Sequence, residues 1–161
     1  MASILGVETL QHTNGTTAAT IDSSGYTTQS QKVHFLASKS DSDVASTADI
    51  VFNNVTENVG SGYNSSTGVF TAPVAGLYFF SAGVTFTFAS GSKSAGFFQS
   101  DNTAYNIIAY ASMASGNAEA QQVCLTMAKQ MAVNDTVKVR VTAGSAGGTA
   151  HQTTFTGYRI G

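Results

Sequence analysis

Hydrophobic and polar residues alternate along several short segments of the chain after residue 32. The clearest alternation covers residues 136–142, where Val137, Val139 and Val141 share one face and polar residues occupy the other. Residues 123–127 alternate in the same way. A period of two is typical of half-buried strands, and Gly, Asn, Ser and Asp clusters separate the segments every eight to twelve residues or so. The pattern predicts an all-β sandwich or barrel with almost no helix.

The segment at residues 77–88 is hydrophobic on both faces at its start. Leu77 and Phe79 lie on the face opposite Tyr78 and Phe80. A strand with two apolar faces packs on its own core and on a neighbour, which in a chain this small predicts another subunit. The alternative is that a few of these residues lie singly on the surface. Two adjacent apolar pairs repeat the pattern, at Phe97-Phe98 and Ile107-Ile108.

The first 31 residues have a different composition from the rest of the chain. They contain no Lys or Arg and two acids, Glu8 and Asp22, among Thr, Ser, Gly and Gln. Residues 16–22 alternate and predict one strand, which Ser24-Gly25 would close with a turn. We interpret residues 1–31 as an extended arm and 32–161 as a globular head, with a disordered tail as the alternative for the arm.

Size and charge narrow the possible functions. The 161 residues and 16.6 kDa suit one domain with its own core, and the single Cys excludes a disulfide framework within the chain. Seven basic and nine acidic residues are too balanced for nucleic-acid binding. No apolar run is long enough to insert into a membrane, and residues 1–8 do not have the pattern of a secretory signal. We therefore expect a mature protein, a protein that is cytosolic when made, or part of an assembly released by other means, with a surface rich in hydroxyl groups.

The sequence contains no recognisable catalytic motif. The three histidines, His12, His34 and His151, are far apart and have no metal-ligand spacing. Cys124 has no nucleophile motif around it, and we expect it to be a packed small side chain. A glycosidase would need Asp101 and Glu119 to face each other, which nothing in the sequence indicates. The prediction is that the protein is not an enzyme.

One long run carries a family resemblance. Residues 63–80, YNSSTGVFTAPVAGLYFF, resemble the signature of the complement C1q globular head and its tumour-necrosis-factor-like relatives. Phe52 and Asn58-Val59-Gly60 precede the run in the family's order. Asn134-Asp135-Thr136-Val137 and Phe155-Thr156-Gly157-Tyr158 resemble its later strands. The resemblance covers about residues 33–161.

Elementary physical chemistry gives several of these positions a structural role. Gly68 follows Asn64-Ser65-Ser66-Thr67, where a turn requires the positive φ that glycine adopts freely. Pro73 separates two strands, and Gly76 leaves room for an aromatic ring of another strand. Gly157 belongs to the closing Phe-x-Gly strand. The residues expected to hold the core are Phe52, Tyr63, Phe70, Tyr78, Phe80, Val137 and Phe155.

The resemblance implies a jelly-roll sandwich of about ten strands that forms a tight homotrimer with apolar contacts at its threefold axis. Leu77, Phe79 and Ile108 are the candidate contact residues. Some members of the family bind calcium near the trimer apex, and Asp41, Asp43 and Asp49 are weak candidates for such a site, with a solvated loop as the alternative. No other cofactor is implied.

The chain contains no Gly-X-Y collagen repeat, and the arm takes its place. Residues 4–11 and 20–25 resemble leader segments of tail-fibre and head-fibre proteins of marine bacteriophages. The prediction is a non-enzymatic homotrimeric structural and adhesion protein of a virion, anchored to the particle by its arm. Loops at 41–48, 89–94 and 143–150 are candidate surfaces for glycans or a receptor. The alternative is a secreted, extracellular C1q-like lectin or cytokine-like ligand of an animal.

Overall fold

The computed structural model describes residues 6–29, 32–39, 43–86, 91–101, 104–113, 121–146 and 153–160. The chain divides into two compact units, one ending at Lys32 and the other beginning at Val33. We call them the arm and the head. No helix in the described ranges has the length and apolar character needed to cross a bilayer.

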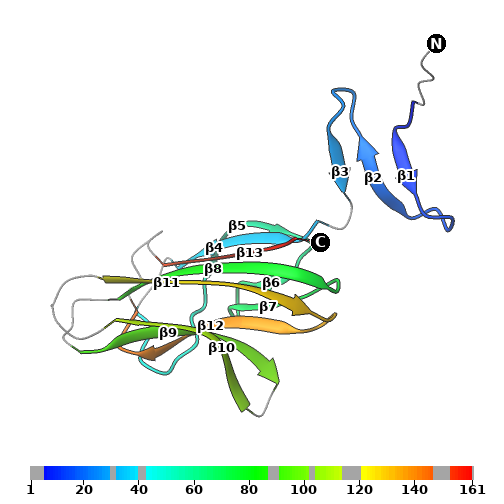
Figure 1. Cartoon of the computed structure of the whole chain (residues 1–161). Helices are drawn as coiled ribbons and strands as arrows, with labels where there is room; N and C mark the ends of the chain where they lie inside the picture. Colours follow the sequence, from blue (N-terminus) through cyan, green and yellow to red (C-terminus); the bar gives the residue numbers. More distant parts are fainter. Residues whose placement is uncertain are drawn as a thin grey trace. The chain divides into compact units, whose positions relative to one another are not determined.

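The described part of the head consists of ten strands in two five-stranded antiparallel sheets (Figure 1). The first, the β8 sheet, has the order β11-β8-β13-β4-β5 and contains β4 (His34–Ser38), β5 (Asn54–Val59), β8 (Gly76–Phe86), β11 (Gln121–Met131) and β13 (Thr154–Arg159). The second, the β9 sheet, has the order β10-β9-β12-β7-β6 and contains β6 (Tyr63–Asn64), β7 (Val69–Thr71), β9 (Lys93–Asp101), β10 (Ala104–Met113) and β12 (Thr136–Ala143). The all-β sandwich is confirmed.

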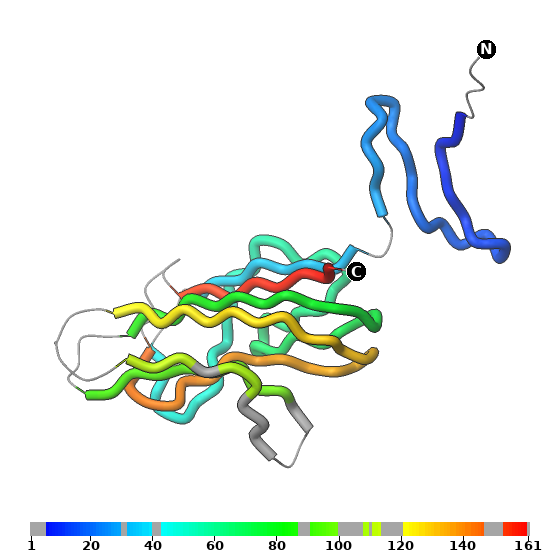
Figure 2. The backbone as a smooth tube through the Cα atoms, in the orientation of Figure 1, coloured from blue at the N-terminus to red at the C-terminus, as the bar shows by residue number. Residues whose placement is uncertain are grey.

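The chain crosses repeatedly between the two layers, as the backbone trace in Figure 2 shows. It changes sheet after β5, β7, β8, β10, β11 and β12. As a result, β13 at the end of the chain pairs with both β4 and β8. Most neighbouring strands are therefore distant in sequence, as expected of a jelly roll.

An aromatic core fills the space between the sheets. All seven residues expected in the core are buried, and their neighbours add further rings. Phe35 stacks on Tyr63 with 4.7 Å between ring centroids and meets the edge of Phe155 at the same distance. Phe70 and Phe80 extend the cluster toward β8 and β9. Large rings on inward-facing positions of both sheets thus supply most of the buried apolar area.

Tyr63 satisfies its polar atoms within this core. Its hydroxyl donates to the Phe52 carbonyl at 3.0 Å and accepts from the Phe52 amide at 3.2 Å. Burial raises the pKa of the Tyr63 phenol well above its ordinary value, against the smaller lowering effect of the Phe52 backbone. The Asn58 side chain, from the upstream motif, bonds the Tyr63 carbonyl and amide at 2.8 and 3.1 Å. These contacts fix the start of β6 against β5.

The structure shows why two positions require glycine. Gly68 has φ of 74°, and a Cβ atom there would collide with the Ile50 carbonyl oxygen. Gly157 lies where a Cβ would be 2.6 Å from ring atoms of both Phe35 and Phe80. At Gly157 the absence of a side chain therefore leaves room for two aromatic rings. Pro73 is exposed in the connection between β7 and β8.

The arm is a three-stranded antiparallel sheet, with β1 (Thr9–Gln11), β2 (Thr17–Ile21) and β3 (Thr27–Gln29) in that order. The sequence predicted β2 and its turn, where Asp22 Oδ1 accepts the amides of Ser24 and Tyr26. The sequence pattern did not indicate β1 and β3, because three-residue strands are too short to display an alternation.

Candidate interaction surfaces

The outer face of the β8 sheet exposes a group of apolar side chains. Along β8, Tyr78 and Phe80 point into the core, so Leu77 and Phe79 lie on the outside. Phe79 is half-buried, and its ring centroid lies 5.3 Å from that of Tyr158 on β13. Two of the three predicted contact residues are thus on the surface of one sheet.

Strand register places further apolar residues beside these two. Tyr158 pairs with Phe79 on one side and His34 on the other, and His34 pairs with Val59. Leu36 follows His34 on the same face of β4. Ile160 continues from β13, and its amide bonds the Leu77 carbonyl at 2.7 Å. We call the set the apolar face; all but Phe79 are between 37% and 53% exposed, and its members are Leu36, Val59, Leu77, Phe79, Tyr158 and Ile160.

Polar groups on this sheet lie within and beside the apolar face. His34 Nε2 lies 3.3 Å from Glu57 Oε2 on the neighbouring strand β5. Cys124, on the outer side of β11, is exposed, and its Sγ is 4.0 Å from Gln122 Oε1. The expectation that Cys124 is packed was wrong, because its side chain is exposed on the outer side of β11. Of the other histidines, His12 lies in the arm, and His151 is outside the described residues.

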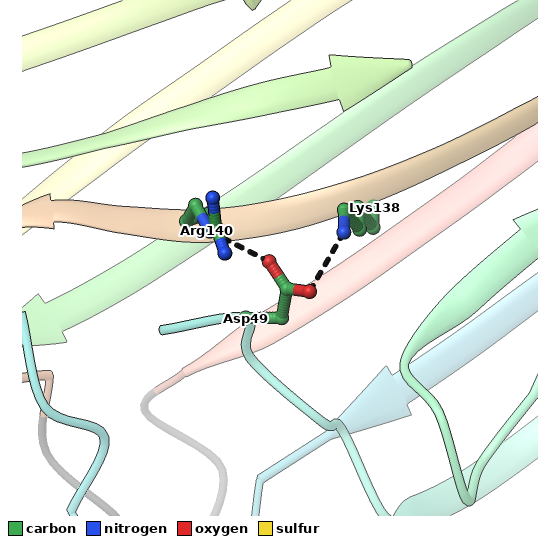
Figure 3. Close-up of polar contacts among 3 residues, drawn as sticks. All are labelled: Asp49, Lys138 and Arg140. Carbon is green, nitrogen blue, oxygen red and sulfur yellow. Dashed lines mark hydrogen bonds and ion pairs between the residues drawn. The ribbon is translucent and has the colours of Figure 1, made fainter. Parts of the chain in front are cut away.

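The β9 sheet covers its own outer aromatic residue. Phe98 points outward from β9 but is only 3% exposed, and the Arg140 guanidinium lies 5.7 Å from its ring centroid. Asp49 holds this cover in place, with Oδ1 2.8 Å from Arg140 Nε and Oδ2 2.7 Å from Lys138 Nζ (Figure 3). The pair Phe97-Phe98 therefore needs no second subunit, contrary to the sequence interpretation.

Ile108, the third predicted contact residue, lies on β10 at the edge of the β9 sheet. It is partly buried and packs against the core cluster. The structure does not bring it onto the face that carries Leu77 and Phe79.

The structure does not group the acidic residues considered for calcium into a metal site among the described residues. Both oxygens of Asp49 face protein cations, which leaves that carboxylate little reason to bind a metal. Asp43 is exposed, and Asp41 lies outside the described residues, as do Glu119 and the side chain of Asp101. Among the residues that are described, no three His, Cys, Asp or Glu side chains gather as a metal site requires.

Two of the predicted recognition loops meet at one end of the sandwich. Val44 and Ala146 exchange backbone hydrogen bonds of 2.8 and 2.9 Å, and Ala146 also bridges to Phe86 at the end of β8. Residues 43–48 and 143–146 are therefore neighbours. The remaining positions of these loops, 41–42 and 147–150, lie outside the described residues, as do 89–90 of the third.

These observations define the class of the protein. Two five-stranded sheets with a shared aromatic core and repeated crossings make a jelly roll of the C1q and tumour-necrosis-factor type. Residues 34–160 match the C1q domain family, and the chain belongs to that family.

Solved structures share the fold at low sequence identity. The chain is similar to the globular domain of zebrafish complement 1qA protein, with a TM-score of 0.65 and 17% identity over 81% of this chain and 98% of that one. It is similar to Eiger TNF from S. frugiperda, with a TM-score of 0.62 and 14% identity over 81% and 92%. Murine APRIL has a TM-score of 0.66 and 8% identity over 81% and 100%. No curated protein sequence matches the chain.

Proposed function

We propose that this C1q-domain protein is a non-enzymatic homotrimer that displays its heads for adhesion. Domains of this type are generally non-enzymatic ligand-binding modules. The observation that carries the trimer is the apolar face, which a single chain leaves open. Single exposed apolar residues are ordinary, but six on neighbouring strands of one sheet mark an interaction site. Burying one half-exposed side chain of the apolar face in a subunit contact would stabilise the trimer by about 1 kcal/mol per copy.

The test is the mass of the protein in solution, measured by light scattering at a protein concentration of about 10 μM. A trimer has three times the 16.6 kDa mass of one chain. Leu77→Glu places a charge on the apolar face and should dissociate the trimer. Val133→Glu is the matched control, because Val133 is an exposed apolar residue in the turn after β11, outside the apolar face.

Circular dichroism of each variant shows whether the chain is still folded. It therefore distinguishes dissociation of the trimer from unfolding of the chain. A folded single copy for Leu77→Glu and a trimer for Val133→Glu would support the proposal. A wild-type protein that remains a folded single copy would overturn it.

The adhesion half of the proposal rests on the loop end of the sandwich and on the arm. The described loop positions are mainly Ser, Thr, Ala and Gly, which suit neutral polar ligands such as glycans. Three linked heads would raise a weak single-site affinity through avidity, if their spacing lets them bind together. A glycan array at high micromolar protein with no binding would remove this half.

The resemblance of residues 4–11 and 20–25 to phage fibre leaders supports a place in a virion, with the arm as the anchor. The similarity of the fold to Eiger TNF and murine APRIL favours a second candidate, an extracellular soluble ligand. Genomic neighbours separate the two. Capsid or tail genes beside the coding sequence support the virion, and a neighbourhood without them counts against it.

A further inference from the structure

Arg159 places a charged side chain on the core side of the head. Along β13, Gly157 is buried on that side and Tyr158 is exposed on the outer side, so the alternation of the strand directs Arg159 toward the core. Its amide donates to the Val33 carbonyl at 2.9 Å, which fixes the backbone at this point. In register, Arg159 pairs with Tyr78 of β8, which is fully buried on the same side. The strand pattern therefore brings a guanidinium to the end of the aromatic core.

The Arg159 side chain makes no hydrogen bond or ion pair with any residue that the structure describes. Its Nε is buried without an acceptor, although the residue as a whole is partly exposed. The Tyr78 hydroxyl is engaged elsewhere, because it donates to the Val74 carbonyl at 2.6 Å. A buried donor without an acceptor destabilises the fold, and a charged donor does so more strongly than a neutral one. Such a group requires an explanation, and a bound ion is one of the few available.

The positive charge of Arg159 also has no countercharge among the described carboxylates. Asp49 contacts two other cations, and Glu57 contacts a histidine on the neighbouring strand β4. Asp135 accepts a backbone amide of its own turn at 2.9 Å. The charge of Arg159 is nevertheless felt in the core: burial raises the pKa of the Tyr78 phenol, and Arg159 is one of the smaller effects that lower it. A positive charge therefore lies beside a buried ring, with no described carboxylate to neutralise it.

We propose that the Arg159 guanidinium binds a small oxyanion, a phosphate, sulfate or carboxylate group, at the end of the core where β8 begins and β13 ends. A guanidinium presents its N–H donors in a planar fork that matches two oxygens of such a group, and these hydrogen bonds are charge-assisted. An oxyanion supplies both an acceptor and a countercharge, whereas water supplies only the acceptor. The partial exposure of Arg159 leaves its guanidinium open to solvent on one side. Because Arg159 points away from the apolar face, the inference does not rest on the proposed homotrimer.

Arg159→Met and Lys129→Met form the matched pair for the test. Register places Lys129 of β11 on the other side of Tyr78, in the same row of the sheet as Arg159, and both are half-buried. Each substitution removes one positive charge and leaves a side chain of similar length, but only Arg159→Met removes the proposed site. Replacement of a buried charge by an apolar side chain is often neutral or stabilising, so Arg159→Met should fold at least as well as the wild type.

The probe is inorganic phosphate, titrated at neutral pH against sodium chloride of equal ionic strength, and the readout is the thermal midpoint of the full-length protein. At ten times its dissociation constant, phosphate should raise the wild-type midpoint by about 3 to 6 °C relative to chloride. Lys129→Met should keep most of this rise, and Arg159→Met should lose it. Phosphate also stabilises proteins through exclusion from their surfaces, but that effect is common to all three proteins, so the difference between them measures the site.

NMR of the wild type supplies a second measurement that does not depend on how the variants fold. The Nε–H signal of Arg159, assigned through its own backbone resonances, should shift with phosphate until the site is saturated, and the curve gives the dissociation constant. A parallel titration with sodium acetate tests a carboxylate at the same signal. Saturation by either anion supports the site, and the tighter of the two identifies the preferred oxyanion group.

Three results would overturn the inference. An equal phosphate response in the wild type and Arg159→Met would show that the anion acts elsewhere. Equal losses in Arg159→Met and Lys129→Met would show a general response to positive charge. An Nε–H signal that neither anion moves would show that Arg159 binds no oxyanion. None of these results changes the mass or the glycan binding that test the proposed function, so the two can fail separately.

Discussion

The two sheets of the head treat their outer faces differently. On the β9 sheet, Phe98 is covered by Arg140, and Asp49 holds Arg140 and Lys138 beside it. On the β8 sheet, the described residues give Leu77 and Tyr158 no such cover, and both are partly exposed. Long cationic side chains can bury apolar surface while their charged ends remain solvated or paired. An outward aromatic residue therefore indicates a partner subunit only where no neighbouring strand supplies this cover.

Phe98→Ala should have the largest effect on the stability of the chain. Because Phe98 is almost fully buried, truncation should lower the free energy of unfolding by about 3 kcal/mol or more. Urea denaturation at a fixed protomer concentration measures this. Phe79→Ala is the matched change on the β8 sheet and should mainly weaken assembly. If both substitutions cost the same in a dissociated chain, the two faces do not differ as described.

The fold was predictable because alternation is a local property. Val137, Val139 and Val141 alternate within β12, and the two-sided start of β8 placed Leu77 and Phe79 on the outer face. Whether a neighbouring strand covers an outward-facing side chain is not a local property of the sequence. Arg140 reaches Phe98 because β12 pairs with β9, a neighbour that no short sequence window reveals.

The rest of the apolar face was missed for the same reason. Leu36, Val59 and Tyr158 lie on three strands that become neighbours through the crossings of the jelly roll. A signal was present in β4, where Phe35 and Ala37 point inward and leave Leu36 outside. Without the strand order, that signal does not connect Leu36 with Leu77.

The interior that both sheets enclose gives a reference for these surface effects. Tyr63→Phe removes the hydroxyl that pairs with both backbone groups of Phe52, and should cost about 1 to 3 kcal/mol at neutral pH. Thermal or urea denaturation measures the loss. A neutral result would mean that water replaces the hydroxyl in the core.

The same substitution should change the alkaline limit of stability. Burial raises the pKa of both Tyr63 and Tyr78 in the folded protein. Above about pH 10 the unfolded chain releases phenolic protons that the folded chain retains, so the free energy of unfolding falls as pH rises. For Tyr63 this loss of stability amounts to up to about 1.4 kcal/mol per pH unit above about pH 10, and below that pH there is no such loss. Tyr63→Phe should remove one such contribution from denaturation midpoints measured between about pH 10 and 11.

Asp49→Asn should have a smaller effect, of about 1 to 2 kcal/mol. The change leaves Lys138 and Arg140 close together without their shared carboxylate, in a partly buried position. High salt should reduce the loss, because ions screen the remaining repulsion. A loss that does not respond to salt would point to a packing role of Asp49 rather than a charge role.

Glu57→Gln is the matched change on the β8 sheet and should have the smallest effect. The pair His34–Glu57 is largely exposed in one chain, and pairs of this kind contribute a few tenths of a kcal/mol. In the Leu77→Glu background, which should hold the protein as a single copy, Glu57→Gln should leave urea midpoints almost unchanged. In the trimer the pair would be shielded from water by a second copy, so the same substitution should weaken assembly measurably in dilution experiments. Suppose instead that Glu57→Gln has an equally small effect in the single copy and in the trimer. The sheet around His34 would then remain in contact with solvent in the trimer, and the subunit contact would be confined to the Leu77 side of the sheet.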